Sequence, residues 1–192
     1  AAIEAAHAGN AHHQGASAIR ALARWIDRAE ALTDYPRGVT VNVGRVEGGT
    51  SKNTVPAAAR AEVDFRYVDP ADGAAVVHAM HALATPEGHA VPGVTLTVTG
   101  GISRTPLTRT EASAALCAQY ARCQREAGLG DGEAPLVGGG SDASTTADAG
   151  VSSIDGLGPR GEGFHTTGEY VELSTLAPKA EALLRFLATL HG

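Results

Sequence analysis

Residues 57–67 read AAARAEVDFRY, and this stretch decides the fold of the first half of the chain. Apolar side chains occupy every second position, and most of the positions between them carry charge: Arg60, Glu62, Asp64 and Arg66. A period of two predicts a β-strand with one buried face and one face in solvent. A sheet with one apolar face must be covered by another layer, so we expect helices to pack against this strand.

The segments around this strand supply such helices and further strands. In chain order the pattern predicts a strand over 1–7, a helix over 14–32, strands over 39–46 and 57–67, a helix starting at Asp69, and a strand over 94–99. The order βαββαβ is that of a ferredoxin-like sandwich, a four-stranded antiparallel sheet with two helices on one face. An open edge strand of such a sheet favours pairing with a second copy, so we expect a homodimer.

The sequence changes character after Gly100-Gly101. It predicts a helix over 110–127, a glycine-rich loop over 138–144, a strand over 151–154, a loop over 161–171 and a helix from Ser174. One short strand between helices cannot complete a sheet of its own. We therefore predict two domains: residues 1–103 form the ferredoxin-like domain, and residues 104–192 are the C-terminal piece of an α/β domain whose other strands lie in preceding sequence.

Composition excludes several classes of function. Of the 192 residues 43% are hydrophobic and only 4% aromatic, and the formal net charge is -6. With no basic stripe and few aromatic side chains on strands, we expect no nucleic-acid partner. No apolar run approaches the ~20 residues of a membrane span, so we expect no membrane insertion. Cys117 and Cys123 are six residues apart on one predicted helix, about 9 Å along its axis, so we expect free thiols.

The chain begins at Ala1, without Met and without a secretory signal. We interpret it as a part of a longer protein. The expected compartment is the cytoplasm, or the periplasm if the preceding sequence carries a signal peptide.

Five segments in order carry a family resemblance: Ala6-His7-Ala8-Gly9, Asn53 to Ala57, Asp64-Phe65-Arg66, Gly138 to Ala143, and His165 to Val171. With these segments the chain resembles the dinuclear-zinc metallopeptidase and aminoacylase family, which includes glutamate carboxypeptidase, acetylornithine deacetylase and succinyl-diaminopimelate desuccinylase. The glycine-rich loop and the Asn-x-x-Pro turn most resemble the glutamate carboxypeptidase branch. The resemblance implies a dimerisation or lid domain joined to a catalytic α/β domain that binds two zinc ions.

The resemblance also implies roles for two histidines. His165 corresponds to the last zinc ligand of the family, since a neutral imidazole can offer one ring nitrogen to zinc. Glu169 is either the acceptor for the other ring nitrogen or a surface or capping residue. His7 is expected to cross the dimer and donate a hydrogen bond to the tetrahedral oxyanion in the partner's active site.

The remaining expected site residues bind substrate. Asn53, Arg66 and Arg104 have side chains suited to a substrate carboxylate, although Arg66 could equally form a salt bridge with Asp64 or Glu62. The loop lacks the Lys-Ser/Thr ending of a phosphate-binding loop, so we expect its backbone to approach substrate closely. Its expected contacts are Gly139, Gly140 and Ser141, with Asp142 as the cap of the next helix.

The implied function is hydrolysis of a peptide or N-acyl amide bond next to a free carboxylate, in a small peptide or N-acyl amino acid. The family's other metal ligands, a His-x-Asp motif, a bridging aspartate and a Glu-Glu pair, have no counterpart in this sequence. One histidine cannot hold two zinc ions, so we expect the 192-residue chain to be inactive alone. The alternative is a dimerisation or binding module without catalytic activity. His12 and His13 are expected to be solvent-exposed loop residues. His78 and His81, three apart on a predicted helix, lack a third ligand and predict no metal site.

Overall fold

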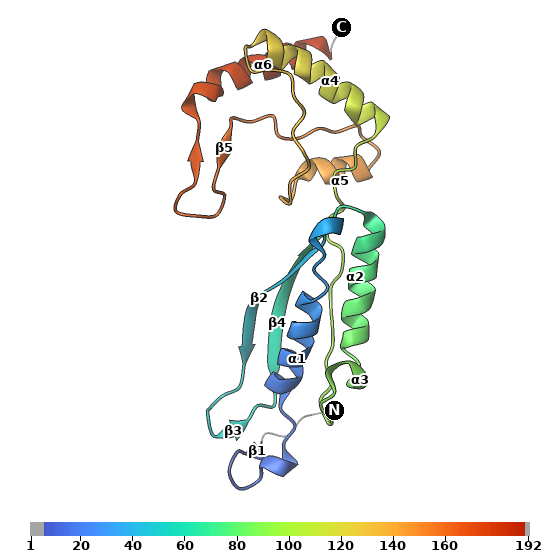
Figure 1. Cartoon of the computed structure of the whole chain (residues 1–192), viewed down its shortest axis with the longest axis vertical. Coiled ribbons are helices and arrows are strands. Elements are labelled where there is room, and N and C mark those ends of the chain that lie inside the picture. Colours follow the sequence, from blue (N-terminus) through green and yellow to red (C-terminus); the bar gives the residue numbers. More distant parts are fainter. Residues whose placement is uncertain (1–5, 191–192) are drawn as a thin grey trace. The chain divides into compact units, whose positions relative to one another are not determined.

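The computed structural model describes residues 6–190 and divides into two compact units, Ala1–Pro106 and Leu107–Gly192 (Figure 1). This division falls three residues after the predicted domain boundary at 103. The mixed α and β class predicted from the sequence is confirmed, since helices and small antiparallel sheets occur together. Among residues 6–190, no helix combines the length and apolar character needed to cross a bilayer.

The centre of the first unit is an antiparallel ribbon of two long strands. β2 spans Thr40–Gly48, and β4 spans Ala59–Arg66, within the stretch that opens the sequence analysis. Thr40 faces Arg66 at one end of the ribbon and Gly48 faces Ala59 at the other. The register shifts by one residue between Val43 and Arg45, which is a β-bulge at Gly44.

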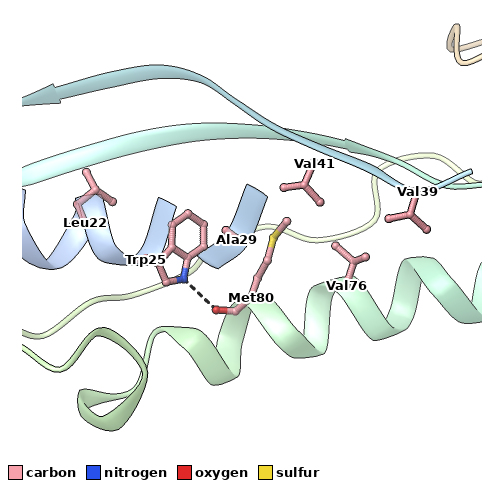
Figure 2. Packing of buried hydrophobic residues seen from close by; sticks show 7 residues of the cluster. All are labelled: Leu22, Trp25, Ala29, Val39, Val41, Val76 and Met80. Atoms are coloured by element: carbon pink, nitrogen blue, oxygen red, sulfur yellow. Dashed lines mark hydrogen bonds between the residues drawn. The ribbon is translucent and has the colours of Figure 1, made fainter. Parts of the chain in front are cut away.

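Two helices cover one face of this ribbon (Figure 1). α1 spans Ala18–Glu30 and α2 spans Pro70–Leu83. Asp69 caps α2 by accepting a hydrogen bond from the Ala71 amide at 2.8 Å, with Pro70 in the first turn, which confirms the predicted helix start. The core between ribbon and helices contains Leu22, Trp25, Ala29, Val39, Val41, Val76 and Met80 (Figure 2).

Trp25 is the largest member of this core, and its indole N–H donates to the Met80 carbonyl at 3.1 Å (Figure 2). A buried indole N–H needs such a partner, and this one joins α1 to α2. α3, over Pro86–His89, extends this side of the unit. The carbonyls of Gly88 and Ala90 accept hydrogen bonds from the guanidinium groups of Arg28 and Arg24 on α1.

The described residues depart from the predicted four-stranded sheet. β1, Ala6–His7, pairs with β3, Thr54–Val55, in a separate small ladder, and residues 94–99 contain no strand. The apolar alternation at 94–99 still has a packing consequence, because Leu96 and Val98 lie against the core. In a ferredoxin-like sheet the neighbour of this segment is the first strand, of which residues 1–5 lie outside the described residues.

The second unit is built on two packed helices, α4 over Glu111–Glu126 and α6 over Leu176–Thr189. Its core is Tyr120, Cys123, Ala182 and Phe186, and the two rings meet edge to face at 5.5 Å. Residues 151–154 form no strand, so this prediction was wrong. The described strand pairing of this unit lies further along the chain, in the predicted loop over 161–171. There β5, Gly161–Glu162, pairs with β6, Tyr170–Val171. Cys117 and Cys123 are free, as predicted.

Candidate functional site

The structure brings together two of the predicted site residues in the first unit, His7 and Asn53. In the β1–β3 ladder His7 lies opposite Thr54, and Ala6 lies opposite Val55. The Ala8 amide then donates to the Asn53 carbonyl at 2.9 Å. The backbone pairing therefore fixes the turn after His7 against the turn that carries Asn53, although 46 residues separate them in sequence.

Both polar side chains of this pair are held at one end and exposed. The His7 Nδ1 atom accepts hydrogen bonds from the Gly9 and Asn10 amides, at 3.1 Å and 3.2 Å. The Asn53 Oδ1 atom accepts a hydrogen bond from the Ser51 hydroxyl. These contacts use an acceptor on each side chain, which leaves the Nε2–H of a neutral His7 and the Asn53 NH₂ as donors. The arrangement suits an anionic ligand.

An open pocket of about 320 Å³ adjoins Asn53. It is lined by Ile19 of α1, the segment Gly48 to Ser51, Thr54 and Pro56. Ile19 is 43% exposed, because the buried face of α1 is defined by Ala18, Leu22 and Trp25. The pocket therefore has one apolar wall and three hydroxyl groups.

Arg66 and Arg104 occupy a different place in the same unit. Arg66, at the end of β4, forms a salt bridge with Asp64 at 2.8 Å between its Nε and Oδ2 atoms. This contact is the alternative expected for Arg66, and Glu62 instead contacts Arg45 at 3.4 Å. The Tyr67 hydroxyl donates to the Arg104 carbonyl at 2.9 Å, so Arg104 lies near this end of β4.

β4 separates the two sets of residues. The β1–β3 ladder lies near the Ala59 end of the ribbon, and Arg66 lies at its other end (Figure 1). Seven steps of an antiparallel strand, at about 3.4 Å each, amount to roughly 24 Å. Within one copy, Asn53 and Arg66 therefore cannot bind the same carboxylate.

In the second unit, His165 lies on the turn between β5 and β6. Its φ is 64°, in the left-handed region that non-glycine residues rarely adopt. Thr166 fixes the turn: its amide and its hydroxyl both donate to the Gly163 carbonyl, at 3.1 Å and 2.7 Å. A Cβ at Gly163 would lie 2.9 Å from the Gly168 carbonyl oxygen, so the close approach of the two strands requires glycine there. The imidazole of His165 is exposed.

The glycine-rich loop ends at α5, Asp142–Asp148. Asp142 was predicted to cap this helix, but the cap is Ser141, whose hydroxyl accepts from the Ala143 amide at 3.0 Å. The helix therefore begins one residue earlier than predicted, because Asp142 is already its first helical residue. A Cβ at Gly139 would meet nothing within 4 Å, and Gly140 beside it is exposed, so their surroundings are open.

Metal ligands were searched across residues 6–190. No group of three or more His, Cys, Asp or Glu side chains in that range lies close enough together to hold a metal ion. The described residues by themselves therefore do not fit a dinuclear centre, and His165 offers a single ligand. The outcome for Glu169 stays open, since its amide, not its carboxylate, makes the described contact, with the Thr166 carbonyl at 3.2 Å.

His89 was assigned no role from the sequence, yet it is 1% exposed. Its Nδ1 atom accepts from the Val91 amide at 3.2 Å, and among residues 6–190 its Nε2 atom has no hydrogen-bond partner. Its position at the end of α3, next to the left-handed Ala90, gave no signal in the hydrophobic periodicity. The residue belongs to the packing of the first unit.

Several groups in the second unit have shifted pKa values, but these arise from packing. Partial burial raises the pKa of the Cys117 thiol and of the Tyr120 hydroxyl. Partial burial also lowers the pKa of Lys179, whose Nζ donates to the Gln124 side chain at 3.0 Å. A protonated Cys117 on α4 is a poor nucleophile.

Comparison with known proteins shows what this chain is similar to. Residues 1–92 match the peptidase dimerisation domain. The chain is 27% identical over 188 residues to carboxypeptidase G2 of Pseudomonas sp. (strain RS-16), a match that covers 97% of this chain and 45% of that protein. It therefore spans about half the length of this relative.

Solved structures agree. A tripeptidase from Staphylococcus aureus is 28% identical with a TM-score of 0.79, over 95% of this chain and 48% of that one. The YxeP protein of Bacillus subtilis, described as a dinuclear metal binding peptidase from the M20 family, shares the fold at 18% identity and a TM-score of 0.65, over 91% of this chain and 46% of that one. These matches show that residues 1–92 are similar to the peptidase dimerisation domain, and that the chain as a whole is similar to known peptidases over about half of their length.

Proposed function

We propose that this chain is part of a zinc-dependent hydrolase that cleaves a peptide or N-acyl amide bond next to a free carboxylate, in the manner of a glutamate carboxypeptidase. The observation that carries the proposal is that the His7–Thr54 pair and the Ala8–Asn53 hydrogen bond bring His7 close to Asn53 at one end of a peptidase dimerisation domain. The match of nearly the whole chain to a carboxypeptidase supports it.

The chemistry of this pair fits acyl transfer. A tetrahedral intermediate carries negative charge on the former carbonyl oxygen, and fixed donors aimed at that oxygen lower the barrier. In the proposal the His7 Nε2–H donates to this oxygen, and the Asn53 NH₂ donates to the substrate. Both donors are preorganised, because the acceptor ends of the two side chains are already held by the Gly9, Asn10 and Ser51 groups.

The geometry of β4 supports an active site shared between two copies. If His7 and Asn53 serve a site in the partner subunit, the distance of roughly 24 Å to Arg66 in the same copy raises no conflict. Arg66 and Arg104 would then contact a substrate bound in their own subunit. For Arg66 this requires exchanging the Asp64 salt bridge for a substrate carboxylate, a small change because both side chains are exposed.

The proposed zinc site requires ligands that the described residues do not supply. His165 would hold one metal ion through an imidazole nitrogen. The bound metal ions would polarise the scissile carbonyl and activate a water molecule. The contribution of this chain is then the rigid turn that presents His165, closed by the two Thr166 hydrogen bonds.

A homodimer through the outer edge of β2 is the proposed assembly. The Val41 and Val43 amides point away from β4, because they bond to the Thr33 hydroxyl at 3.1 Å and the Glu30 carboxylate at 3.0 Å. These contacts already cover that half of the edge. Beyond the bulge, Val46 lies opposite Ala61, whereas Val43 lies opposite Val63. Because Ala61 and Val63 are two residues apart on β4, the backbone groups of Val46 point away from β4, as those of Val43 do.

Val46 is also 53% exposed, which is unusual for an apolar residue on a strand edge. A two-fold axis at Val46 would pair this residue with Val46 of the partner subunit. It would also set each Arg45 opposite the partner subunit's Glu47, a favourable cross-strand pair. The open edge of β2 after the bulge is therefore complementary to the same edge of a second copy.

The test uses the full protein that contains this chain. We expect close to two zinc ions per chain, and hydrolysis of an N-acyl-glutamate but not of the corresponding N-acyl amine that lacks the carboxylate. His165→Ala should remove metal and activity, whereas His78→Ala, an exposed histidine on α2, should change neither. Absence of bound metal and of hydrolysis in the wild type would refute the proposal and favour a dimerisation or binding module.

The shared site has its own test. His7→Ala and His165→Ala proteins are each expected to be nearly inactive, and mixed dimers should regain activity at one of their two sites. If a mass measurement shows that mixed dimers have formed but no activity returns, His7 belongs to the site of its own subunit.

A further inference from the structure

The turn after β1 holds the His7 imidazole by one of its two nitrogens. The Gly9 and Asn10 amides both donate to Nδ1, at 3.1 Å and 3.2 Å. In a neutral imidazole, the nitrogen that accepts hydrogen bonds carries no proton, and the other nitrogen carries it. The turn therefore favours the tautomer with its proton on Nε2.

The two amides are themselves fixed in place. On one side of them Ala8 donates to the Asn53 carbonyl at 2.9 Å, and on the other side Ala11 donates to the His7 carbonyl at 3.0 Å. Moving either amide away from the ring would strain one of these backbone bonds. The direction in which the amides point is thus set by the ladder and the turn, not by the imidazole.

We propose that Gly9 and Asn10 are positioning residues whose backbone amides lock His7 in the Nε2–H tautomer. The opposite tautomer would present a lone pair at Nε2, which repels an oxyanion instead of stabilising it. The value of the lock for catalysis rests on the proposed function, but the lock itself does not. Each neutral hydrogen bond shifts an equilibrium about two- to tenfold, so the pair should shift the tautomer ratio about 4- to 100-fold.

The experiment measures the tautomer directly in the 192-residue chain. Two-bond ¹H–¹⁵N correlation spectra of the ¹⁵N-histidine-labelled chain are recorded at pH about 8.5, where an ordinary imidazole is neutral. The His7 signals are assigned with His7→Gln. We expect a protonated Nε2 and an unprotonated Nδ1, with the other tautomer below about a fifth. An even mixture, or a protonated Nδ1, in the wild type would overturn the proposal.

A matched pair of variants tests the amides. Asn10→Pro removes one donor and should raise the Nδ1–H population about two- to tenfold, whereas Asn10→Ala keeps the amide and should change nothing. Gly9→Ala is a second control, since its Cβ would lie at an ordinary 3.4 Å from the His7 ring. Identical spectra for the two Asn10 variants would also refute the lock. The buried His89 reports in the same spectra whether the unit is folded.

This measurement separates the two proposals. A locked tautomer together with full activity of a His7→Ala enzyme would leave the lock standing and remove His7 from catalysis. A mixed tautomer together with a loss of activity in that variant would do the reverse.

Discussion

The edge of β2 allows a sharp test of how two copies associate, through the substitution Val46→Pro. Proline has no amide hydrogen, so it breaks any hydrogen bond in which Val46 is the donor. Inside one chain that loss costs little, because the Val46 amide points away from β4. Proline is also tolerated on edge strands for this reason. The substitution should therefore spare the fold and damage only the pairing of two copies.

The expected magnitude follows from the symmetry. With a two-fold axis at Val46, the two copies exchange two hydrogen bonds at this residue, each from the amide of one copy to the carbonyl of the other. Both are lost in a homodimer of the variant. At about 0.5–1.5 kcal/mol each, the loss is about 1–3 kcal/mol, which raises the dimer dissociation constant about 5- to 150-fold.

Sedimentation velocity over a concentration series measures this constant, and circular dichroism checks that the fold is intact. Val46→Thr is the matched control, because it keeps the amide and a β-branched side chain and should dissociate like the wild type. Glu47→Pro should instead unfold the ribbon, because Glu47 pairs inward with Arg60. An unchanged dissociation constant in a well-folded Val46→Pro protein would refute pairing through this edge.

Two further predictions concern the units themselves. Trp25→Phe removes the donor to the buried Met80 carbonyl and should lower the free energy of unfolding of the first unit by about 1–3 kcal/mol, measured by urea denaturation, while Tyr35→Phe, at an exposed ring, should change it little. The hydrogen bond from Arg109 lowers the pKa of Glu133, so this carboxylate stabilises the second unit above the ordinary carboxyl pKa, and that stabilisation is lost as the pH falls through the lowered value. Glu133→Gln should therefore have a lower urea midpoint than the wild type at pH 7, and the two midpoints should converge as the pH falls below the lowered pKa of Glu133; a difference that persists in acid would contradict this origin.

Periodicity predicted the long elements well because their faces are decided by burial. The alternation over 57–67 became β4, and the Asp69-Pro70 pair capped α2 as expected. The helical pattern over 14–32 did not by itself define the buried side of α1: Trp25 lies in the core, while Ile19 is 43% exposed. In an alanine-rich helix several stripes are almost equally apolar, and only the shape of the facing ribbon selects one.

The candidate site was predictable as a set of residues but not as an arrangement. Family-like segments pointed to His7 and Asn53, yet their contact depends on a ladder of two-residue strands, too short to leave a periodic signal. The choice of Ser141 over Asp142 as the cap depends on a one-residue register that either side chain could satisfy. Interactions with the backbone, such as the two amides on His7, are equally invisible in side-chain patterns.

β4 has a consequence for how related proteins can vary, because its length sets the separation between the two groups of residues that we propose bind substrate. A two-residue insertion, matched in β2, would keep every side chain on its face and move Arg66 about 7 Å further from the His7 end. A one-residue insertion would instead turn the Arg66 side chain toward the core. The separation between the two groups within one copy can therefore change only in steps of two residues, about 7 Å each, if every side chain is to keep its face.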